Sequence, residues 1–325
     1  MKLVSIVVPC YNEEDSVRLF FTTVDPVLKS IGTVNYEFIY VNDGSKDSTE
    51  QEMKELSEEE QNVRFISFSR NFGKEAAMLA GIEAARGDAI ILMDVDLQDP
   101  PELLPQMVED WQFGGYDVVY TRRSTRSGEP PIRSWCAKNF YKLINNMSDV
   151  HIVDGARDYR LMDRKAVDSF LRLKERNRFA KGLFMWVGYN TKCIEFENVE
   201  RAVGSTSWSF WKLVHYAIDG IVSFTISPLR WATYFGLFTA STAFLYMFYV
   251  IFTKLIFGNA VSGYASIVSI MLFFGGIQLI FLGIIGEYIG RIFIEVKARP
   301  NYIVKSKSSS TLPNKENIRK ATIQK

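Results

Sequence analysis

The stretch DAIILMDVDLQDPPE, residues 88–102, leads from a run of apolar residues directly into a group of carboxylates. The apolar part is typical of a buried strand, and the two prolines favour a turn followed by the start of a helix. At the end of a strand, Asp94 and Asp96 point the same way, and Gln98 can follow in the next turn. These hard oxygen ligands suit Mg²⁺ or Mn²⁺ held jointly with substrate phosphates, whereas the alternative is an ordinary solvated acidic turn.

Strand-like and helix-like segments alternate over the first 125 residues. Apolar strands that alternate with helices predict an α/β fold, with a mainly parallel sheet covered on both faces. The expected strands are 3–9, 36–42, 63–69, 88–95 and 116–121, and the expected helices lie near 13–31, 47–60, 73–86 and 101–113. Beyond them we expect a helix at 133–147, a strand at 157–163, a helix at 179–188 and a strand at 190–200.

Polar clusters follow four of these strands, and they read CYNEE, NDGSKDST, SRNFGKE and DVDLQD. Ligands bind outside the carboxyl ends of parallel strands, so we expect the four clusters to converge in one cleft. The net charge of +1 gives no indication of a nucleic-acid partner. Three cysteines and two histidines, all widely spaced, favour neither a disulfide framework nor a zinc site.

The C-terminal part has a different composition. Lys254 is the only charged residue between Arg230 and Glu287, so residues 231–253 and roughly 264–286 each form an uncharged run long enough to cross a bilayer. The link between the two runs is short, which predicts a hairpin. Basic residues collect outside the hairpin, and by the positive-inside rule both ends are cytoplasmic.

The sequence therefore divides into four parts. We expect a cytoplasmic α/β domain at 1–206, an amphipathic helix at 207–228, a membrane region at 229–290 with helices at about 229–254 and 264–288, and a cytoplasmic basic tail at 291–325. The amphipathic helix carries an aromatic stripe, which is more often part of a protein core, but the membrane span that begins directly after it favours the membrane interface. The last part of the tail, KSKSSSTLPNKENIRKATIQK (305–325), is rich in lysine and serine, and we expect it to be disordered and to touch anionic lipid.

Several motifs in register resemble family-2 glycosyltransferases of the GT-A fold. They are VPCYNEE (8–14), VNDGSKDST (41–49), SRNFGKEAA (69–77) and DVDLQDPPE (94–102). Three further motifs resemble the polyprenyl-phosphate branch, which includes bactoprenol glucosyltransferases and dolichol-phosphate mannose synthases. They are RDYRLMDR (157–164), NRFAKGLFMWVGY (177–189) and GEYIGRIFIEVKARPNY (286–302).

The resemblance implies roles for residues at the strand ends. The nucleotide pocket would be lined by Pro9, Tyr11, Glu13, Asp43, Lys74, Asp94 and Val95. Taken alone, Asp43 would be an ordinary turn residue and Lys74 a solvated lysine. Asp94, Asp96 and Gln98 would hold Mg²⁺ or Mn²⁺, which offsets charge on the leaving nucleoside diphosphate.

The acceptor side follows from the same resemblance. Asp158 is the expected catalytic carboxylate, which orients or deprotonates the acceptor, or only pairs with a neighbouring arginine. A lipid phosphate has a second pKa near ~6, so a strong base is less necessary than cations that bring two dianions together. The candidate cations are Arg122, Arg133, Arg160, Arg178 and Lys181, with Arg160 first. Many relatives have a lysine where Ser207 stands, so no phosphate contact is assigned there.

The implied activity is inverting transfer of a hexose from a nucleotide-sugar to undecaprenyl or another polyprenyl phosphate. The expected donor is UDP-glucose or UDP-N-acetylglucosamine, and the expected location is the cytoplasmic face of the inner cell membrane. A homo-oligomer formed through the transmembrane helices is a further expectation.

Three alternatives stay open. A processive polysaccharide synthase would carry a Q-x-x-R-W motif, and here Ser227 stands where the glutamine would be. A transporter or flippase subunit is another alternative, but this chain has only two expected spans and no intramembrane acid pair, and the nucleotide cleft would be unexplained. A membrane protein that binds nucleotide-sugar without catalysis would not need Asp94, Asp96 and Asp158.

Overall fold

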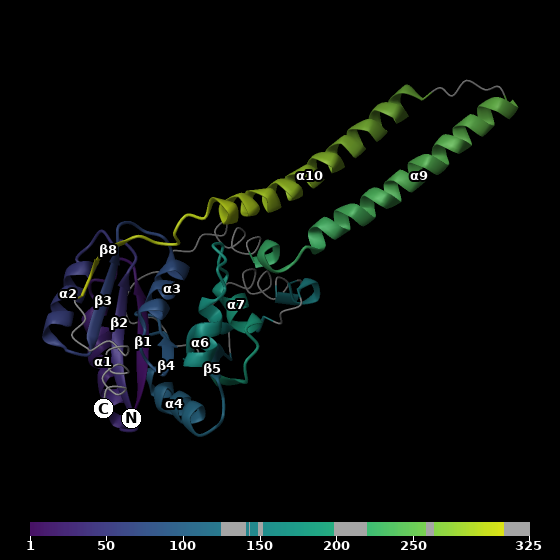
Figure 1. Ribbon diagram of the computed structural model, residues 1–325. Coiled ribbons are helices and arrows are strands. Elements are labelled where there is room, and N and C mark those ends of the chain that lie inside the picture. The colour runs from purple at the N-terminus through teal and green to yellow at the C-terminus, as the bar shows by residue number, and fades with distance from the viewer. Residues whose placement is uncertain (125–140, 143, 149–151, 198–219, 258–262, 309–325) are drawn as a thin grey trace, which may run out of the picture.

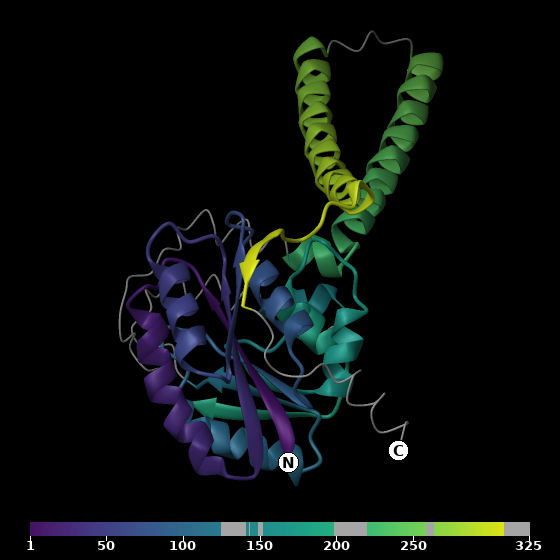
Figure 2. The same cartoon turned by 60° about the vertical axis from the view of Figure 1, so that its left-hand side comes forward.

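The computed structural model describes residues 1–124, 141–142, 144–148, 152–197, 220–257 and 263–308. Figure 1 shows an α/β domain from which two long helices project as a hairpin. The N-terminus lies at the opposite end of the domain from the hairpin, and the first strand runs from there toward the hairpin (Figures 1 and 2). The carboxyl ends of the strands parallel to it therefore face the base of the hairpin.

An eight-stranded sheet forms the centre of the domain, in the order β7-β5-β6-β4-β1-β2-β3-β8. The strands are β1 (Lys2–Cys10), β2 (Val34–Asn42), β3 (Val63–Phe68), β4 (Ala89–Leu92), β5 (Val118–Arg123), β6 (Ala156–Asp163), β7 (Thr191–Phe196) and β8 (Val304–Lys307). Parallel pairs join β1 to β2 and β4, β2 to β3, and β5 to β7, whereas β6 and β8 run antiparallel to their neighbours. The prediction of a mainly parallel sheet is confirmed.

Helices cover both faces of the sheet, as predicted. They are α1 (Ser16–Ile31), α2 (Thr49–Glu59), α3 (Lys74–Ala84), the short η1 (Pro101–Leu103), α4 (Leu104–Gln112), α6 (Arg164–Leu171) and α7 (Ala180–Trp186). Alternate residues of β1 serve the two faces: Ile6 and Val8 pack with α1 and α4, and Val7 packs with α3. Gly81 lets α3 approach closely, because a Cβ there would lie 2.2 Å from the Val7 side chain.

The hairpin consists of α9 (Ser227–Phe257) and α10 (Tyr264–Lys297). By length and hydropathy, Ser227–Thr253 and Ser269–Lys297 can each cross a membrane, and none of their most apolar residues is buried inside the protein. The two expected spans are thus present as helices suited to membrane association. The expected amphipathic helix at 207–228 falls mostly outside the described residues, of which 220–224 are helical.

Part of the tail that we expected to be disordered is ordered. After α10, β8 pairs antiparallel with β3 along the edge of the sheet. Tyr302 stacks on Phe68, with ring centroids 4.8 Å apart, and Lys305 forms a 2.8 Å ion pair with Glu50 on α2. The unpaired backbone of the edge strand β3 offers a template that fixes this segment in spite of its polar composition. Residues 309–325 lie outside the described part of the chain.

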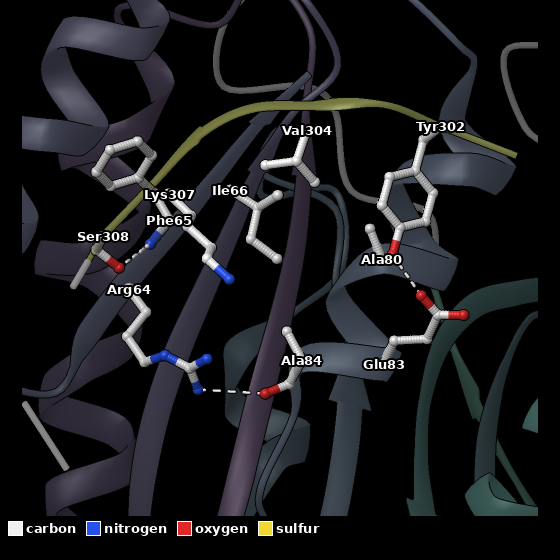
Figure 3. Close-up of a pocket in the computed structure, with 10 residues that line it drawn as sticks. All are labelled: Arg64, Phe65, Ile66, Ala80, Glu83, Ala84, Tyr302, Val304, Lys307 and Ser308. Carbon is white, nitrogen blue, oxygen red and sulfur yellow. Dashed lines mark hydrogen bonds between the residues drawn. The ribbon is translucent and has the colours of Figure 1, made fainter. Parts of the chain in front are cut away.

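A cavity of about 300 Å³ lies beneath this returning segment (Figure 3). Its lining comes from β3, from the C-terminal half of α3 and from the returning segment. Arg64 and Lys307 extend toward it, while the Tyr302 hydroxyl bonds to Glu83 at one side (Figure 3). None of the site residues predicted from the sequence lines this cavity, so it is separate from the expected cleft.

Candidate active site

The turn after β4 carries the predicted metal ligands. β4 ends before Asp94, so Asp94 and Asp96 lie in this turn and not on the strand itself. The side chain of Asp99 closes the turn by accepting a hydrogen bond from the Asp94 backbone N–H at 3.4 Å. Leu97 adopts a left-handed φ of 55°, which helps the chain to reverse before η1 begins. The carboxylates therefore stand at the carboxyl edge of the sheet on a turn held by hydrogen bonds between its backbone N–H groups and its own carboxylates.

Strand β6 brings Asp158 to the same edge. It runs antiparallel to β4 with Leu92 opposite Arg160, and continuing that register by two residues places Asp94 opposite Asp158. Lys74, the first residue of α3, lies between them, with its ammonium 2.7 Å from an Asp94 oxygen and 2.8 Å from Asp158 Oδ2. Three elements that are distant in sequence thus meet on one lysine.

This pairing fixes the charge of both partners. Burial alone would raise the pKa of Asp158, but the charges of Lys74 and Lys181 hold that pKa well below its usual range. Burial alone would lower the pKa of Lys74, and the charges of Asp158 and Asp94 raise it instead. Because a carboxylate with a depressed pKa is a weak base, orienting cations suits Asp158 better than taking a proton.

Three further residues that we did not identify from the sequence support the turn. Arg157 Nε donates to Asp99 Oδ1 at 3.0 Å, and its guanidinium lies 3.9 Å from Asp94 Oδ2. Arg123, at the end of β5, donates to Gln98 Oε1 at 3.1 Å. Arg157 and Asp99 lie within the quoted motifs RDYRLMDR and DVDLQDPPE, which is the signal that could have identified them.

Asp43 shapes the loop that leads into α3. Its Oδ1 accepts a hydrogen bond from the Phe72 N–H at 2.6 Å, and its Oδ2 accepts one from Gly73 at 2.9 Å. Gly44 turns the chain behind it with φ of 65°, and a Cβ there would lie 2.2 Å from the Arg70 carbonyl carbon. Both oxygens of Asp43 are engaged in the ligand-free protein, and its contact with a nucleotide base stays a prediction.

The other predicted nucleotide-binding residues lie at the same edge. Pro9 is the last residue but one of β1, and Tyr11, directly after the strand, has an exposed ring. The Glu13 N–H donates to Thr49 Oγ1 at 2.8 Å, which joins the segment after β1 to the start of α2. Val95 is buried, so a nucleotide could reach only its backbone.

Arg160 differs from the expectation that it contacts the acceptor phosphate. Its side chain is buried, its NH2 donates to the Arg157 carbonyl at 2.7 Å, and its guanidinium lies 4.0 Å from the centre of the Phe184 ring. Burial lowers its pKa to about 10. Because these donors are used within the protein, Arg160 supports β6 and is not exposed to a ligand.

Two of the remaining candidates for contact with the acceptor phosphate are also engaged by other residues of the protein. Arg178 donates to the Leu173 carbonyl at 2.7 Å, and Arg122 lies 3.7 Å from Glu195 at the sheet edge. Lys181, by contrast, makes no hydrogen bond or ion pair with any residue that the structure describes. Burial lowers the pKa of Lys181, and the charge of Asp158 opposes that effect. Lys181 is thus the cation most available to an acceptor, and the predicted Arg133 lies outside the described residues.

The donor set is compatible with a hard divalent cation. Asp94 and Asp96 are both partly accessible, and the Lys74 ammonium already shows that a positive charge is held beside Asp94. Gln98 is less available, because its amide oxygen accepts the bond from Arg123. Within the described ranges no three His, Cys, Asp or Glu side chains are grouped as metal ligands, so oxygens of a bound substrate would have to complete the site.

Two family models match the chain. Glycosyl transferase family 2 matches residues 5–171, which include most of the sheet and the carboxylate site but not β7 or β8. The GtrB C-terminal hairpin matches residues 227–292, which include α9 and most of α10.

Known proteins match nearly the whole chain. An uncharacterized glycosyltransferase of Synechocystis is 46% identical over 92% of this chain and 94% of its own length. A prophage-derived bactoprenol glucosyl transferase of Shigella flexneri is 46% identical over 93% of this chain and 97% of its own length. Among solved structures, glucosyl-3-phosphoglycerate synthase from Mycobacterium tuberculosis is 19% identical, with a TM-score of 0.46, over 68% of this chain and 78% of that one. The chain belongs to glycosyl transferase family 2, and it is a glycosyltransferase whose catalytic domain is followed by a GtrB C-terminal hairpin.

Proposed function

We propose that this glycosyltransferase transfers glucose from UDP-glucose to a polyprenyl phosphate at the cytoplasmic surface of a membrane, with inversion at the anomeric carbon. One observation carries the proposal: the site adjoins the base of the hairpin. Glu295 on α10 accepts hydrogen bonds from the backbones of Arg176 and Asn177, just before the α7 residue Lys181. The name of the Shigella relative supports glucose as the sugar and bactoprenol phosphate as the acceptor.

The proposed reaction needs no proton transfer. An oxygen of the acceptor phosphate attacks the anomeric carbon of glucose and forms a bond to it. The bond from that carbon to the diphosphate oxygen breaks, and its electron pair leaves with UDP. At pH 7 the acceptor is mostly a dianion, because its second pKa lies near ~6. Asp158 therefore has no proton to take, in keeping with the low pKa that Lys74 imposes on it.

The chain's own cations bring the two anionic substrates together. Lys74 and Lys181 flank Asp158, and Asp158 orients Lys74 through the 2.8 Å ion pair. Preorganised charges in a partly buried site stabilise developing charge more than the same groups in water. Asp94 and Asp96 would hold Mg²⁺ or Mn²⁺, whose chemistry is to compensate charge on the departing diphosphate. Arg157 and Asp99 keep the Asp94 turn in position.

The hairpin explains how a soluble donor and a lipid acceptor meet. With α9 and α10 across the bilayer and both termini cytoplasmic, the catalytic domain stays at the surface where the acceptor headgroup lies. Confinement there raises the effective concentration of the acceptor. The apolar faces of α9 and α10 that no described residue covers would contact lipid or a second copy of the hairpin.

The test is an assay with the full-length protein in liposomes that contain undecaprenyl phosphate, supplied with labelled UDP-glucose and Mg²⁺ or Mn²⁺. We expect one glucose on each lipid, joined with the anomeric configuration opposite to that of the donor. Polymer would favour a processive synthase instead. The absence of lipid-linked glucose, with the protein folded and UDP bound, would refute the proposal, and product from UDP-N-acetylglucosamine alone would correct the sugar.

A further inference from the structure

The segment 176–181, which follows α6 and includes the first two residues of α7, is attached at its outer end to the membrane hairpin. Glu295 Oε1 on α10 accepts hydrogen bonds from the Arg176 N–H at 2.8 Å and from the Asn177 N–H at 3.1 Å. The side chain of Asn177 donates to Ser223 Oγ at 2.9 Å, within the helical residues 220–224 that precede α9. The segment is therefore held both by α10 and by the residues that lead into α9.

At its inner end, the same segment is attached to the active site. Glu75 follows Lys74 in the first turn of α3, and its Oε2 accepts a hydrogen bond from the Ala180 N–H at 3.2 Å. Lys181 is the next residue, so this bond fixes the backbone that carries the available cation. Glu75 also faces the charge of Asp158.

Packing makes the segment stiff between these two attachments. Phe179 is buried and packs edge-on against Phe224, with ring centroids 5.9 Å apart. A Cβ at Gly182 would lie 2.4 Å from the Phe224 ring, so α7 lies directly on the helix that precedes α9. This packing joins the residues before α9 to the start of α7, which carries Lys181.

We propose that Glu295 and Glu75 are positioning residues for the transfer reaction, which through segment 176–181 hold Lys181 beside Asp158 when the hairpin is docked. The kinetic consequence of this proposal rests on the proposed function, whereas the attachment of segment 176–181 to the hairpin does not. The essential feature at Glu295 is the oxygen that accepts two backbone bonds. Glutamine retains such an oxygen, whereas alanine leaves both N–H groups without it.

Hydrogen exchange tests the attachment without any substrate. The full-length protein in nanodiscs is compared with Glu295→Ala, Glu295→Gln and the control Glu287→Ala, which removes an exposed carboxylate from the same helix. We expect the amides of residues 176 and 177 to exchange about tenfold faster in Glu295→Ala, as one lost hydrogen bond would allow. Glu295→Gln and the control stay near wild type. Unchanged exchange in Glu295→Ala would overturn the proposal.

Kinetics test the consequence. We expect Glu295→Ala and Glu75→Ala to raise the KM for polyprenyl phosphate roughly tenfold, because a small misplacement of a positioned group is costly. The KM for UDP-glucose and the affinity for UDP stay unchanged, and the glutamine variants retain most acceptor affinity. Equal losses for both substrates, or wild-type kinetics in Glu295→Ala, would overturn the positioning role. If the wild type glucosylates no lipid, the proposed function fails, and the exchange data alone decide the attachment.

Discussion

The proposed donor half and the proposed acceptor half of this site are built in different ways. The donor half lies where β1, β2 and β4 end, within the first hundred residues, and the parallel sheet alone brings these ends together. The acceptor half takes Asp158 from an antiparallel strand, Lys181 from α7 and its support from α10. The two halves meet on Lys74. The donor half thus follows from local rules, whereas the acceptor half depends on contacts between distant segments.

The largest loss of activity should come from a substitution that disables the donor half alone. We expect Asp96→Asn to lower kcat by about 100-fold or more, because it removes a charge that would hold the divalent cation on the diphosphate. The thermal unfolding temperature should change little, since Asp96 is partly exposed. Asp168→Asn on α6 is the matched control. Wild-type turnover by Asp96→Asn, or by the wild type in excess EDTA, would contradict the metal role.

Lys74→Ala should affect both halves at once. Without the ammonium, Asp94 and Asp158 face each other with less compensation, so we expect a loss of about 10- to 100-fold in kcat/KM for each substrate. The pKa of Asp158 should rise toward its ordinary range, which moves the acidic limb of the pH profile to higher pH. Lys74→Arg keeps the charge and should retain part of the activity. A loss confined to one substrate would show that the halves do not meet on Lys74.

Glu75 gives a signed prediction for stability. Burial and the charge of Asp158 raise its pKa to about 7 from the ordinary 4.5, so the folded state binds this proton more tightly than the unfolded state. Stability contributed by Glu75 is therefore lost as the pH rises from about 4.5 to 7. The free energy of unfolding of Glu75→Gln should equal that of the wild type at pH 4.5. At pH 8 it should be higher than that of the wild type, by at most about 3 kcal/mol. Thermal unfolding of both proteins at the two pH values measures this difference in stability. The same difference between variant and wild type at pH 4.5 and at pH 8 would contradict the prediction.

The smallest effect is expected at the hairpin base. Glu287 and Arg291 form an exposed ion pair of 3.3 Å one helical turn apart, and such pairs contribute about 0–1 kcal/mol. Glu287→Ala should therefore change neither the unfolding temperature nor acceptor kinetics appreciably, unlike Glu295→Ala. A large rise in the acceptor KM of Glu287→Ala would instead place this pair where the lipid headgroup binds.

Much of the donor half could be predicted from the sequence. The apolar strands, the prolines after Asp99 and the polar clusters that follow the strands locate the sheet and the edge at which Asp94 and Lys74 lie. These features depend on neighbours in sequence and on the general rule for parallel strands.

The rest depends on pairings that no local pattern reveals. The guanidinium of Arg160 donates to a carbonyl of its own strand and packs on the Phe184 ring. The presence of an arginine in the motif does not reveal these contacts. The polar composition of residues 304–307 favoured disorder, yet the free edge of β3 pairs with them. Glu75 and Glu295 lie within quoted motifs, but the sequence does not show what they contact, because each accepts hydrogen bonds from the backbone of a distant segment.

The most direct test is a cryo-electron microscopy structure of the full-length protein in nanodiscs with Mn²⁺, UDP and polyprenyl phosphate. The account predicts the cation and the diphosphate at Asp94 and Asp96, with the acceptor phosphate within hydrogen-bond distance of Lys181. A diphosphate bound away from the turn at residues 94–98, or an acceptor phosphate on a different face from Lys181 and Asp158, would contradict it.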